Sequence, residues 1–255
     1  MKNKILALSF SLLAFSSSEA LAVEYAQDGL VDAYADLAWD ELAVTGVSAY
    51  TWSHSQSMAR TADYWDITTQ TTWVQQTIFN AAVSIAESSV SVGDYDAAKA
   101  TGETQAAFIS SQSTAQLLSG SYGAYSAEAR AMHGQTYSVA SAGTVTFSIP
   151  YFLDVDVEDS NGDNAEYAYT RAWSWLRLYN STTTQWDQVA GTYTEVTSGS
   201  GSLNISYTAA AGSYLLFEAG ADTRAAILNP VPVPPSVLML LTGCTSLFFL
   251  KRRKS

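Results

Sequence analysis

The sequence has one cysteine among its 255 residues, Cys244, and that residue lies in an apolar stretch near the C-terminus. The rest of the chain therefore cannot form a disulfide framework or a thiolate metal cluster. Proline is also scarce, since four of the five prolines fall within residues 230–235. The stability of the remaining chain must come from burial of a core, or from a bound ion.

Positive charge is the other scarce feature. Six of the 12 basic residues lie in the two end segments, against one of the 24 acidic residues, Glu19. The body from Val23 to Asn229 therefore carries 23 acids and 6 bases, a net charge of −17. Such a surface repels nucleic acid and anionic lipid, so neither is expected as a partner of the body. It is typical of a soluble secreted protein, and it also suits a binder of divalent cations.

The N-terminus has the three parts of a secretory signal peptide. Two lysines precede residues 5–15, which are mostly apolar, and residues 20–22 (Ala-Leu-Ala) form a small-residue cleavage site. The apolar run is too short to span a bilayer comfortably, which argues against an uncleaved anchor. We expect a signal helix within residues 1–22, cleavage by signal peptidase after Ala22, and export of the rest of the chain.

The C-terminal segment, residues 229–255, also divides into three parts. Residues 229–236 hold four prolines, which lack an N–H and fix φ, so this stretch should be an extended spacer. Residues 237–250 carry no charge, and residues 251–254 are all basic. Such an apolar helix spans about 21 Å, which is short for a hydrocarbon core of about 30 Å. The basic cluster should stay cytoplasmic with the body across the membrane, as in a plain tail anchor.

The order of these parts resembles the PEP-CTERM sorting signal of Gram-negative bacteria. The residues that carry the resemblance are Val231, Pro232, Val233, Pro234, Lys251, Arg252, Arg253 and Lys254. Val233 stands where the family usually has a glutamate between the prolines. The resemblance implies recognition by an exosortase-type membrane protease and cleavage near the prolines, after transient anchoring in the inner membrane by the helix. It also implies delivery to the cell surface or matrix of a host that makes exopolysaccharide.

The domain between the end segments, residues 23–228, is expected to be mainly β. From Val145 to Glu158 apolar and polar residues alternate, which is typical of a half-buried antiparallel strand. Pro150 suggests an edge position or a bend in this strand, and Asn161-Gly162 predicts a hairpin turn after it. Alternation resumes from Tyr167 to Tyr179. We therefore predict an antiparallel β-sandwich or jelly-roll-like body.

The first half of this domain has weaker patterns. Apolar residues at helical spacing within residues 23–44 permit a helix there. Residues 68–85 are rich in Thr, Val, Ile and aromatic residues, which favours a strand. Residues 106–131 are dominated by small residues, and we expect them to add further sheet to the same domain.

One acidic segment is a candidate calcium site. Oxygen ligands at the end of a strand and in the following turn suit Ca²⁺, which is a hard cation. The candidate ligands are Asp154, Asp156, Asp159, Asn161 and Asp163. Their spacing is not that of an EF-hand loop, because the sixth position is Asp159 and not glycine. The simpler interpretation is a solvated strand face that leads into a polar turn, with no cofactor.

An aromatic strand face is the candidate carbohydrate site. Every odd position from Tyr167 to Tyr179 is aromatic or arginine, so in a regular strand these side chains share one face. Flat rings suit pyranose faces, and arginine donors suit hydroxyls or uronic carboxylates. The candidate residues are Tyr169, Arg171, Trp173, Trp175 and Arg177. The alternative is that the tryptophans face the core, with the arginines at its rim.

Signatures of catalysis are lacking in the sequence. The two histidines, His54 and His133, have no partner pattern nearby, and we interpret them as surface or satisfied polar residues. We therefore expect a non-enzymatic exported protein with a structural or adhesive role in contact with exopolysaccharide. The alternatives are a carbohydrate-binding module that uses the aromatic face, or a secreted hydrolase whose catalytic residues are scattered along the chain.

Overall fold

The computed structural model describes residues 29–63, 68–76, 84–92, 95–117, 123–159, 166–195 and 198–229. The signal peptide predicted for residues 1–22 lies outside these residues, as does the sorting signal beyond Asn229. None of the helices in the described ranges has the length and apolarity needed to cross a membrane.

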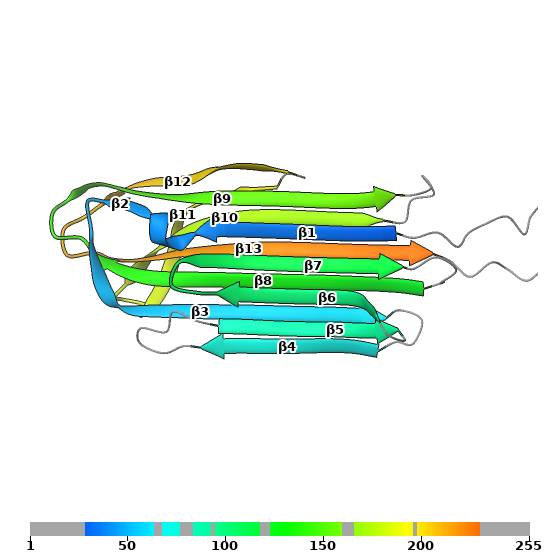
Figure 1. Ribbon diagram of the computed structural model, residues 1–255. Coiled ribbons are helices and arrows are strands. Elements are labelled where there is room, and N and C mark those ends of the chain that lie inside the picture. Colours follow the sequence, from blue (N-terminus) through cyan, green and yellow to red (C-terminus); the bar gives the residue numbers. More distant parts are fainter. Residues whose placement is uncertain are drawn as a thin grey trace, which may run out of the picture.

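The described chain forms two antiparallel sheets that lie face to face (Figure 1). In spatial order, sheet A holds β12 (Gly199–Ala209), β9 (Gly143–Asp159), β1 (Gly29–Ala38), β7 (Phe108–Leu117), β6 (Tyr95–Thr104) and β5 (Ser84–Val92), with β2 (Ala43–Thr45) also paired to β9. Sheet B holds β11 (Gln185–Thr194), β10 (Tyr167–Asn180), β13 (Tyr214–Asn229), β8 (Gly123–Ser138), β3 (Ser48–Asp63) and β4 (Thr68–Gln76). The only helical element of the described residues is a 3₁₀ turn, η1 (Trp39–Glu41). The prediction of a mainly antiparallel β body is confirmed.

Strand β9 has the alternation that its sequence predicts. Its buried side chains are Val145, Phe147, Ile149 and Leu153, and its acidic side chains on the other face are exposed. The edge position suggested by Pro150 is wrong, because β9 lies between β12 and β1. Pro150 instead lies in a gap on one side of β9. The pairing of β9 with β1 ends at Tyr151, and its pairing with β2 begins at Ser148, so Pro150 pairs with neither of these strands.

The helix that residues 23–44 permit is not formed by the described part of that segment. Residues 29–38 are strand β1, between β9 and β7. Its odd-numbered residues face the core, and among them are Val31, Ala33, Ala35 and Leu37. The apolar residues at helical spacing include Leu30 and Tyr34, which lie on the half-buried outer face. Pairing on both sides of β1 outweighs the local pattern, as tertiary context often does.

The hairpin predicted around Asn161-Gly162 is also wrong. The turn residues themselves lie outside the described residues, but the two flanking strands do not pair with each other. β9 belongs to sheet A and β10 to sheet B, so the connection between them crosses from one sheet to the other. A local turn signal cannot distinguish a hairpin from such a crossover, because the partner of each strand comes from elsewhere in the chain.

The interior has two unlike halves. One is filled by large side chains, including Phe147 and Phe217, whose rings stack with centroids 4.7 Å apart. The other is dominated by alanine, and hydroxyl groups bond across the sheets, for example Ser57 to Ser84 at 2.6 Å. In that half, a Cβ atom on Gly102 of β6 would lie 2.8 Å from the carbonyl oxygen of Met58 in β3. Small residues there let the backbones of the two sheets approach closely, because no bulky side chain separates them.

The two ends of the described chain lie together. Strand β1 begins and strand β13 ends at the same end of the molecule (Figure 1), and Gly29 lies beside the side chain of Ile227. The described body therefore begins and ends at one pole.

Candidate functional site

The aromatic face predicted for β10 lies on the outside of sheet B. The even-numbered residues Ala172, Ser174 and Leu176 are fully buried between the sheets, whereas most odd-numbered residues are partly exposed. Trp173 is the exception on the outer face, since it is only 8% exposed. The tryptophans therefore do not face the core, and the alternative interpretation of this strand is wrong.

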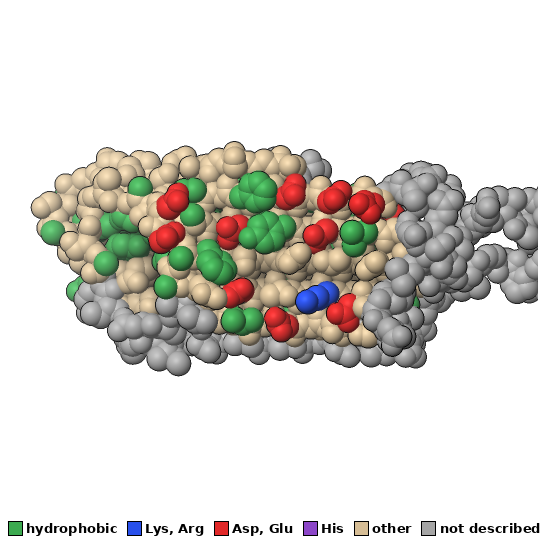
Figure 2. Space-filling model, viewed as in Figure 1, with side chains coloured by type: hydrophobic (Ala, Val, Ile, Leu, Met, Phe, Trp, Pro, Cys, Tyr) green, Lys and Arg blue, Asp and Glu red, His purple; other side chains and the backbone are tan. Residues whose placement is uncertain are grey.

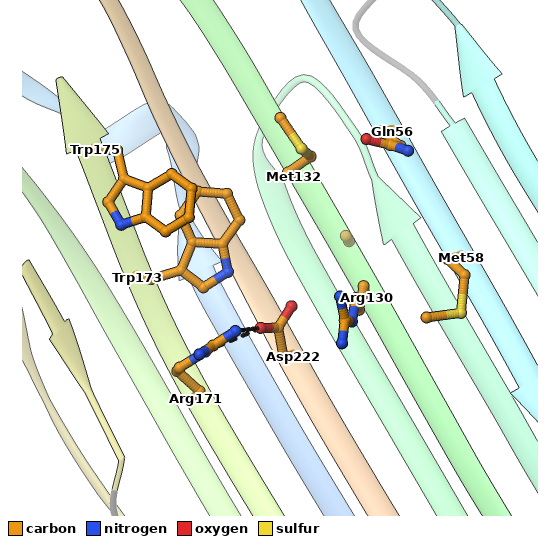
Figure 3. A pocket seen from close by; sticks show the side chains of 9 residues that line it. Gln56, Met58, Arg130, Met132, Arg171, Trp173, Trp175 and Asp222 are labelled. Carbon is orange, nitrogen blue, oxygen red and sulfur yellow. Dashed lines mark hydrogen bonds and ion pairs between the residues drawn. The ribbon is translucent and has the colours of Figure 1, made fainter. Parts of the chain in front are cut away.

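Neighbouring strands extend this outer face into a pocket. Strands β10, β13, β8 and β3 lie in that order, and their register places Trp173, Gly220, Met132 and Gln56 in one row across the sheet. The pocket has a volume of about 260 Å³ and opens on this row and the adjacent ones (Figure 3). Its lining residues are Gln56, Met58, Arg130, Ala131, Met132, Arg171, Trp173, Trp175 and Asp222.

Glycine in the adjacent strands lets the rings lie against the sheet. A Cβ atom on Gly220 would overlap the ring of Trp173, and it would also lie 2.7 Å from the carbonyl oxygen of Ala131. A Cβ atom on Gly191 would lie 2.8 Å from Trp175. The two indole rings are in contact, with centroids 4.8 Å apart and planes 37° apart. Glycine is thus required beside each tryptophan because the backbone is approached closely there.

Two buried carboxylates on β13 flank the tryptophan that covers Gly220. Asp222 is 6% exposed and accepts hydrogen bonds from Nε and Nη2 of Arg171, the first at 2.9 Å. Burial alone would lower the pKa of Arg171, but the bond to Asp222 and its charge raise that pKa above its ordinary value. Arg171 is therefore held rigidly as a cation at the edge of the pocket.

Glu218 is 5% exposed and interacts with two basic side chains. Its Oε2 atom lies 2.7 Å from Nε of Arg177, and its Oε1 atom lies 3.2 Å from Nε2 of His54. His54 reaches Glu218 across Gly134 of β8, where a Cβ atom would lie 2.7 Å from Nδ1 of the imidazole. The imidazole is thus paired at Nε2, whereas its buried Nδ1 atom has no hydrogen-bond partner among the described residues, so the interpretation of His54 as a satisfied polar residue holds for one nitrogen only.

Tyr169 closes the site toward the end of β11. Its hydroxyl donates a hydrogen bond of 2.8 Å to Glu195, which also lies 3.9 Å from Arg171. Burial, together with this bond, raises the pKa of Tyr169 to about 12, so the phenol stays protonated at physiological pH. The five residues chosen from the sequence thus lie along one face, and three of them, Arg171, Trp173 and Trp175, line the pocket.

The indole N–H of Trp173 is a buried donor without an acceptor in the part of the chain that the structure describes. Nε1 of Trp173 has no hydrogen-bond partner among the described residues, although the indole is more than nine-tenths buried. The ring nitrogen lies on the edge of the indole that faces Asp222 and Arg130 (Figure 3). A buried donor without an acceptor is uncommon, because it has lost its bond to water without replacement.

Sequence patterns did not identify the residues that β13, β8 and β3 contribute. Glu218 and Asp222 are the two acids in a mostly apolar run from Tyr214 to Leu228, which also holds Thr223 and Arg224, and Gly220 lies midway between the acids. Acidic residues within an apolar strand, with a glycine between them, were the signal that could have marked this strand. The contributions of Gln56 and Met132 carry no such signal, because only the register brings them to the pocket.

Three of the five candidate calcium ligands lie on β9 of the other sheet. Asp154 and Asp156 are exposed on the outer face of sheet A, where acidic side chains are spread widely (Figure 2). Asp159 ends β9, and Asn161 and Asp163 lie outside the described residues. Within the described ranges, no three His, Cys, Asp or Glu side chains come close enough to hold a metal ion. The calcium site therefore remains a prediction.

His133 is a core residue and not a surface one. It is 4% exposed, and its ring meets the edge of Trp39 at a centroid distance of 4.3 Å. Burial, with a smaller contribution from the charge of His54, lowers the pKa of His133 to about 4. The imidazole is therefore neutral at physiological pH and belongs to the core.

No protein-family model matches this chain, and searches of curated proteins and of solved structures found no match either. A function for this protein must therefore be argued from its own residues and geometry.

Proposed function

We propose that this protein is exported to the cell surface or extracellular matrix and contacts exopolysaccharide through the outer face of sheet B. The role is structural or adhesive and non-enzymatic. The observation that carries the proposal is the outward aromatic face of β10, with Trp173 and Trp175 at a pocket rather than in the core. Pyranose rings bind to such faces through their apolar C–H surfaces, while arginines and carboxylates bond their hydroxyls.

The arrangement of the chain ends supports sorting through the termini. A signal peptide before Gly29 and a PEP-CTERM-like segment after Asn229 would both leave the same pole of the body (Figure 1). Asp222 lies seven residues before Asn229 on β13, which is about 23 Å along an extended strand. A body held at the membrane by its C-terminal segment would therefore present the pocket on its side, clear of the bilayer.

The finer features of the fold belong to the same proposal. We propose that the two sheets form a jelly-roll-like sandwich, preceded by a signal helix and followed by a short C-terminal apolar helix. Signal peptidase removes the first helix, and an exosortase-type protease acts near Pro232 and Pro234. Mass spectrometry of the mature protein tests this processing. A C-terminus intact through Ser255, in cells that contain an active sorting protease, would contradict it.

Tryptophan fluorescence during titration with extracellular polysaccharide from a producing strain tests binding. We expect saturable quenching by the wild-type protein. The double variant Trp173→Ala, Trp175→Ala lacks these reporting rings, so its binding is measured by co-sedimentation with the polymer, and we expect that binding to be lost. Phe152→Ala is the matched control, because Phe152 is an aromatic residue that is 46% exposed on the outer face of sheet A. Equal binding by wild type, control and double variant would rule out this face as the binding surface.

Soluble oligosaccharides separate an adhesive role from that of a carbohydrate-binding module. The pocket of about 260 Å³ favours the module as a second candidate, because this volume fits one sugar residue and little more. Quenching by short oligosaccharides as well as by polymer would indicate a module. Quenching by polymer alone would indicate an extended adhesive contact.

A further inference from the structure

We propose that the pocket on sheet B binds a carboxylated sugar residue, so that the preferred ligand is an anionic polysaccharide built from uronic acids. This inference rests on the proposed function and specifies the substrate class of the same site. Three independent features of the structure carry it: the distribution of charge, the donors around the pocket, and the unpartnered indole N–H.

The basic side chains of the body are gathered on one face. All six lie among the described residues, and five of them are arginines on the outer face of sheet B: Arg60, Arg130, Arg171, Arg177 and Arg224. The sixth, Lys99, lies on the outside of sheet A. The acids of the described residues on that sheet's outer face include Asp32, Asp36, Glu87, Glu103, Asp154, Asp156 and Glu158.

This distribution decides how an anionic polymer approaches. The outer face of sheet A carries scattered acidic side chains and little positive charge (Figure 2), so it repels polyanions. On sheet B, Glu218 and Asp222 are each buried and ion-paired with an arginine. The more exposed acids of this face, Glu128 and Glu195, lie 2.8 Å from Arg130 and 3.9 Å from Arg171, so their charge is also offset by an arginine. A chain with 23 acids in its body therefore offers sheet B as the face that a polyanion can reach.

The pocket is lined by more donors than acceptors. Arg130, Arg171, Gln56 and the indole of Trp173 supply N–H groups, and Asp222 and the Gln56 carbonyl supply the acceptors. Arg171 already satisfies Asp222. Of the other donors, the indole N–H of Trp173 has no acceptor among the described residues. A ligand carboxylate presents two oxygen atoms in the plane that a guanidinium such as that of Arg130 binds.

Arg130 is the residue best placed to change partners. Its side chain is 54% exposed, and its ion pair with Glu128, at 2.8 Å, is a surface contact two residues away on the same strand. Such exposed pairs are weak, so a ligand carboxylate can replace Glu128 without a large penalty. Arg130 and the ring nitrogen of Trp173 face the same space in the pocket (Figure 3).

The apolar part of the pocket fits the sugar ring. The ring of Trp175 lies beside Trp173, and the guanidinium of Arg177 lies 5.9 Å from the centroid of Trp175. Met58 and Met132 form the opposite wall (Figure 3). A uronate residue would place its C–H face against Trp175 and direct its carboxylate toward Arg130 and Nε1 of Trp173.

Equilibrium titrations with defined polymers at 0.15 M salt test this inference. The probes are polygalacturonate, a neutral dextran and dextran sulfate, with tryptophan fluorescence as the readout. We expect polygalacturonate to bind best. Arg130→Gln should weaken its binding at least about tenfold, because a charge-assisted bond is lost. Trp173→Phe keeps a ring but removes the N–H, and should weaken binding by about three- to tenfold.

Arg60→Gln is the matched control for Arg130→Gln. Arg60 is exposed on the same face and its loss changes net charge equally, but it does not line the pocket. We expect Arg60→Gln to weaken binding by less than about threefold. Equal losses in both variants would overturn the pocket as the carboxylate site and leave only general attraction.

The remaining outcomes separate this inference from the proposed function. Tighter binding of dextran than of polygalacturonate, with no effect of Arg130→Gln, would overturn the inference while polysaccharide binding stands. Preference for dextran sulfate would overturn the assignment to carboxylates. Failure of every polymer, including the producing strain's own polysaccharide, would overturn both.

Discussion

Replacement of Gly220 by alanine should remove the aromatic arrangement of the site with little change elsewhere. A Cβ atom there would overlap the ring of Trp173 and lie 2.7 Å from the carbonyl oxygen of Ala131. The ring can move away, but the carbonyl is part of the β8 backbone in the same sheet. We therefore expect Trp173 to be displaced and the pocket to lose its shape.

The size of the effect follows from two opposing contributions. Overpacking of this kind costs about 1–3 kcal/mol of folding free energy. Alanine also restricts the unfolded chain, which stabilises the protein by about 0.4–1 kcal/mol. The expected net loss is about 1–2 kcal/mol, equivalent to a decrease in Tm of about 2–8 °C for a domain of this length.

Gly143→Ala is the matched control, because a Cβ atom at Gly143 would meet no atom within 4 Å. We expect this variant to be as stable as the wild type or slightly more stable. Thermal unfolding followed by far-UV circular dichroism measures stability, and near-UV circular dichroism and tryptophan emission report on Trp173. If Gly220→Ala matched Gly143→Ala in Tm with unchanged tryptophan spectra, the close packing of Trp173 on β13 would be refuted.

Two further predictions concern the interior. The pKa of His133 is about 4 in the folded protein, against 6.5 in the unfolded chain. Between these two pH values the unfolded chain binds more protons than the folded protein. The free energy of unfolding therefore falls as the pH decreases from 6.5 to 4. This loss of stability reaches about 3 kcal/mol. Urea titrations at pH 7.5 and 4.5 should show it in the wild type but not in His133→Gln. The same pH dependence in both proteins would contradict the lowered pKa of His133. Burial raises the pKa of Asp36, which acts in the opposite direction and cancels in that comparison. Gly102→Ala should lower the free energy of unfolding by at least about 2 kcal/mol relative to the wild type, which is more than the loss expected for Gly220→Ala. The reason is that its Cβ would meet backbone carbonyl oxygens of two strands in the facing sheet. Urea unfolding measures this loss, and a variant as stable as Gly143→Ala would show that the sheets are not closely packed there.

The sequence determined those features that depend on neighbouring residues alone. The alternation in β9 and β10 fixed which side chains share a face, since consecutive side chains of a strand point to opposite sides whatever the partner strands are. The same periodicity grouped Tyr169, Arg171, Trp173, Trp175 and Arg177 on one face. The assignment of residues 106–131 to further sheet also agrees with β7 and β8.

The tertiary structure decided which strands pair and which face is buried. A strand with aromatics on one side and Ala172, Ser174 and Leu176 on the other can bury either side, and only the opposing sheet selects the small residues for the core. The helical spacing near Leu30 and the turn signal at Asn161-Gly162 failed for the same reason. Both are local, whereas strand pairing joins residues far apart in the chain. The pocket has this origin too, because Gln56, Arg130 and Asp222 meet through the register of strands β3, β8 and β13, which no local sequence pattern encodes.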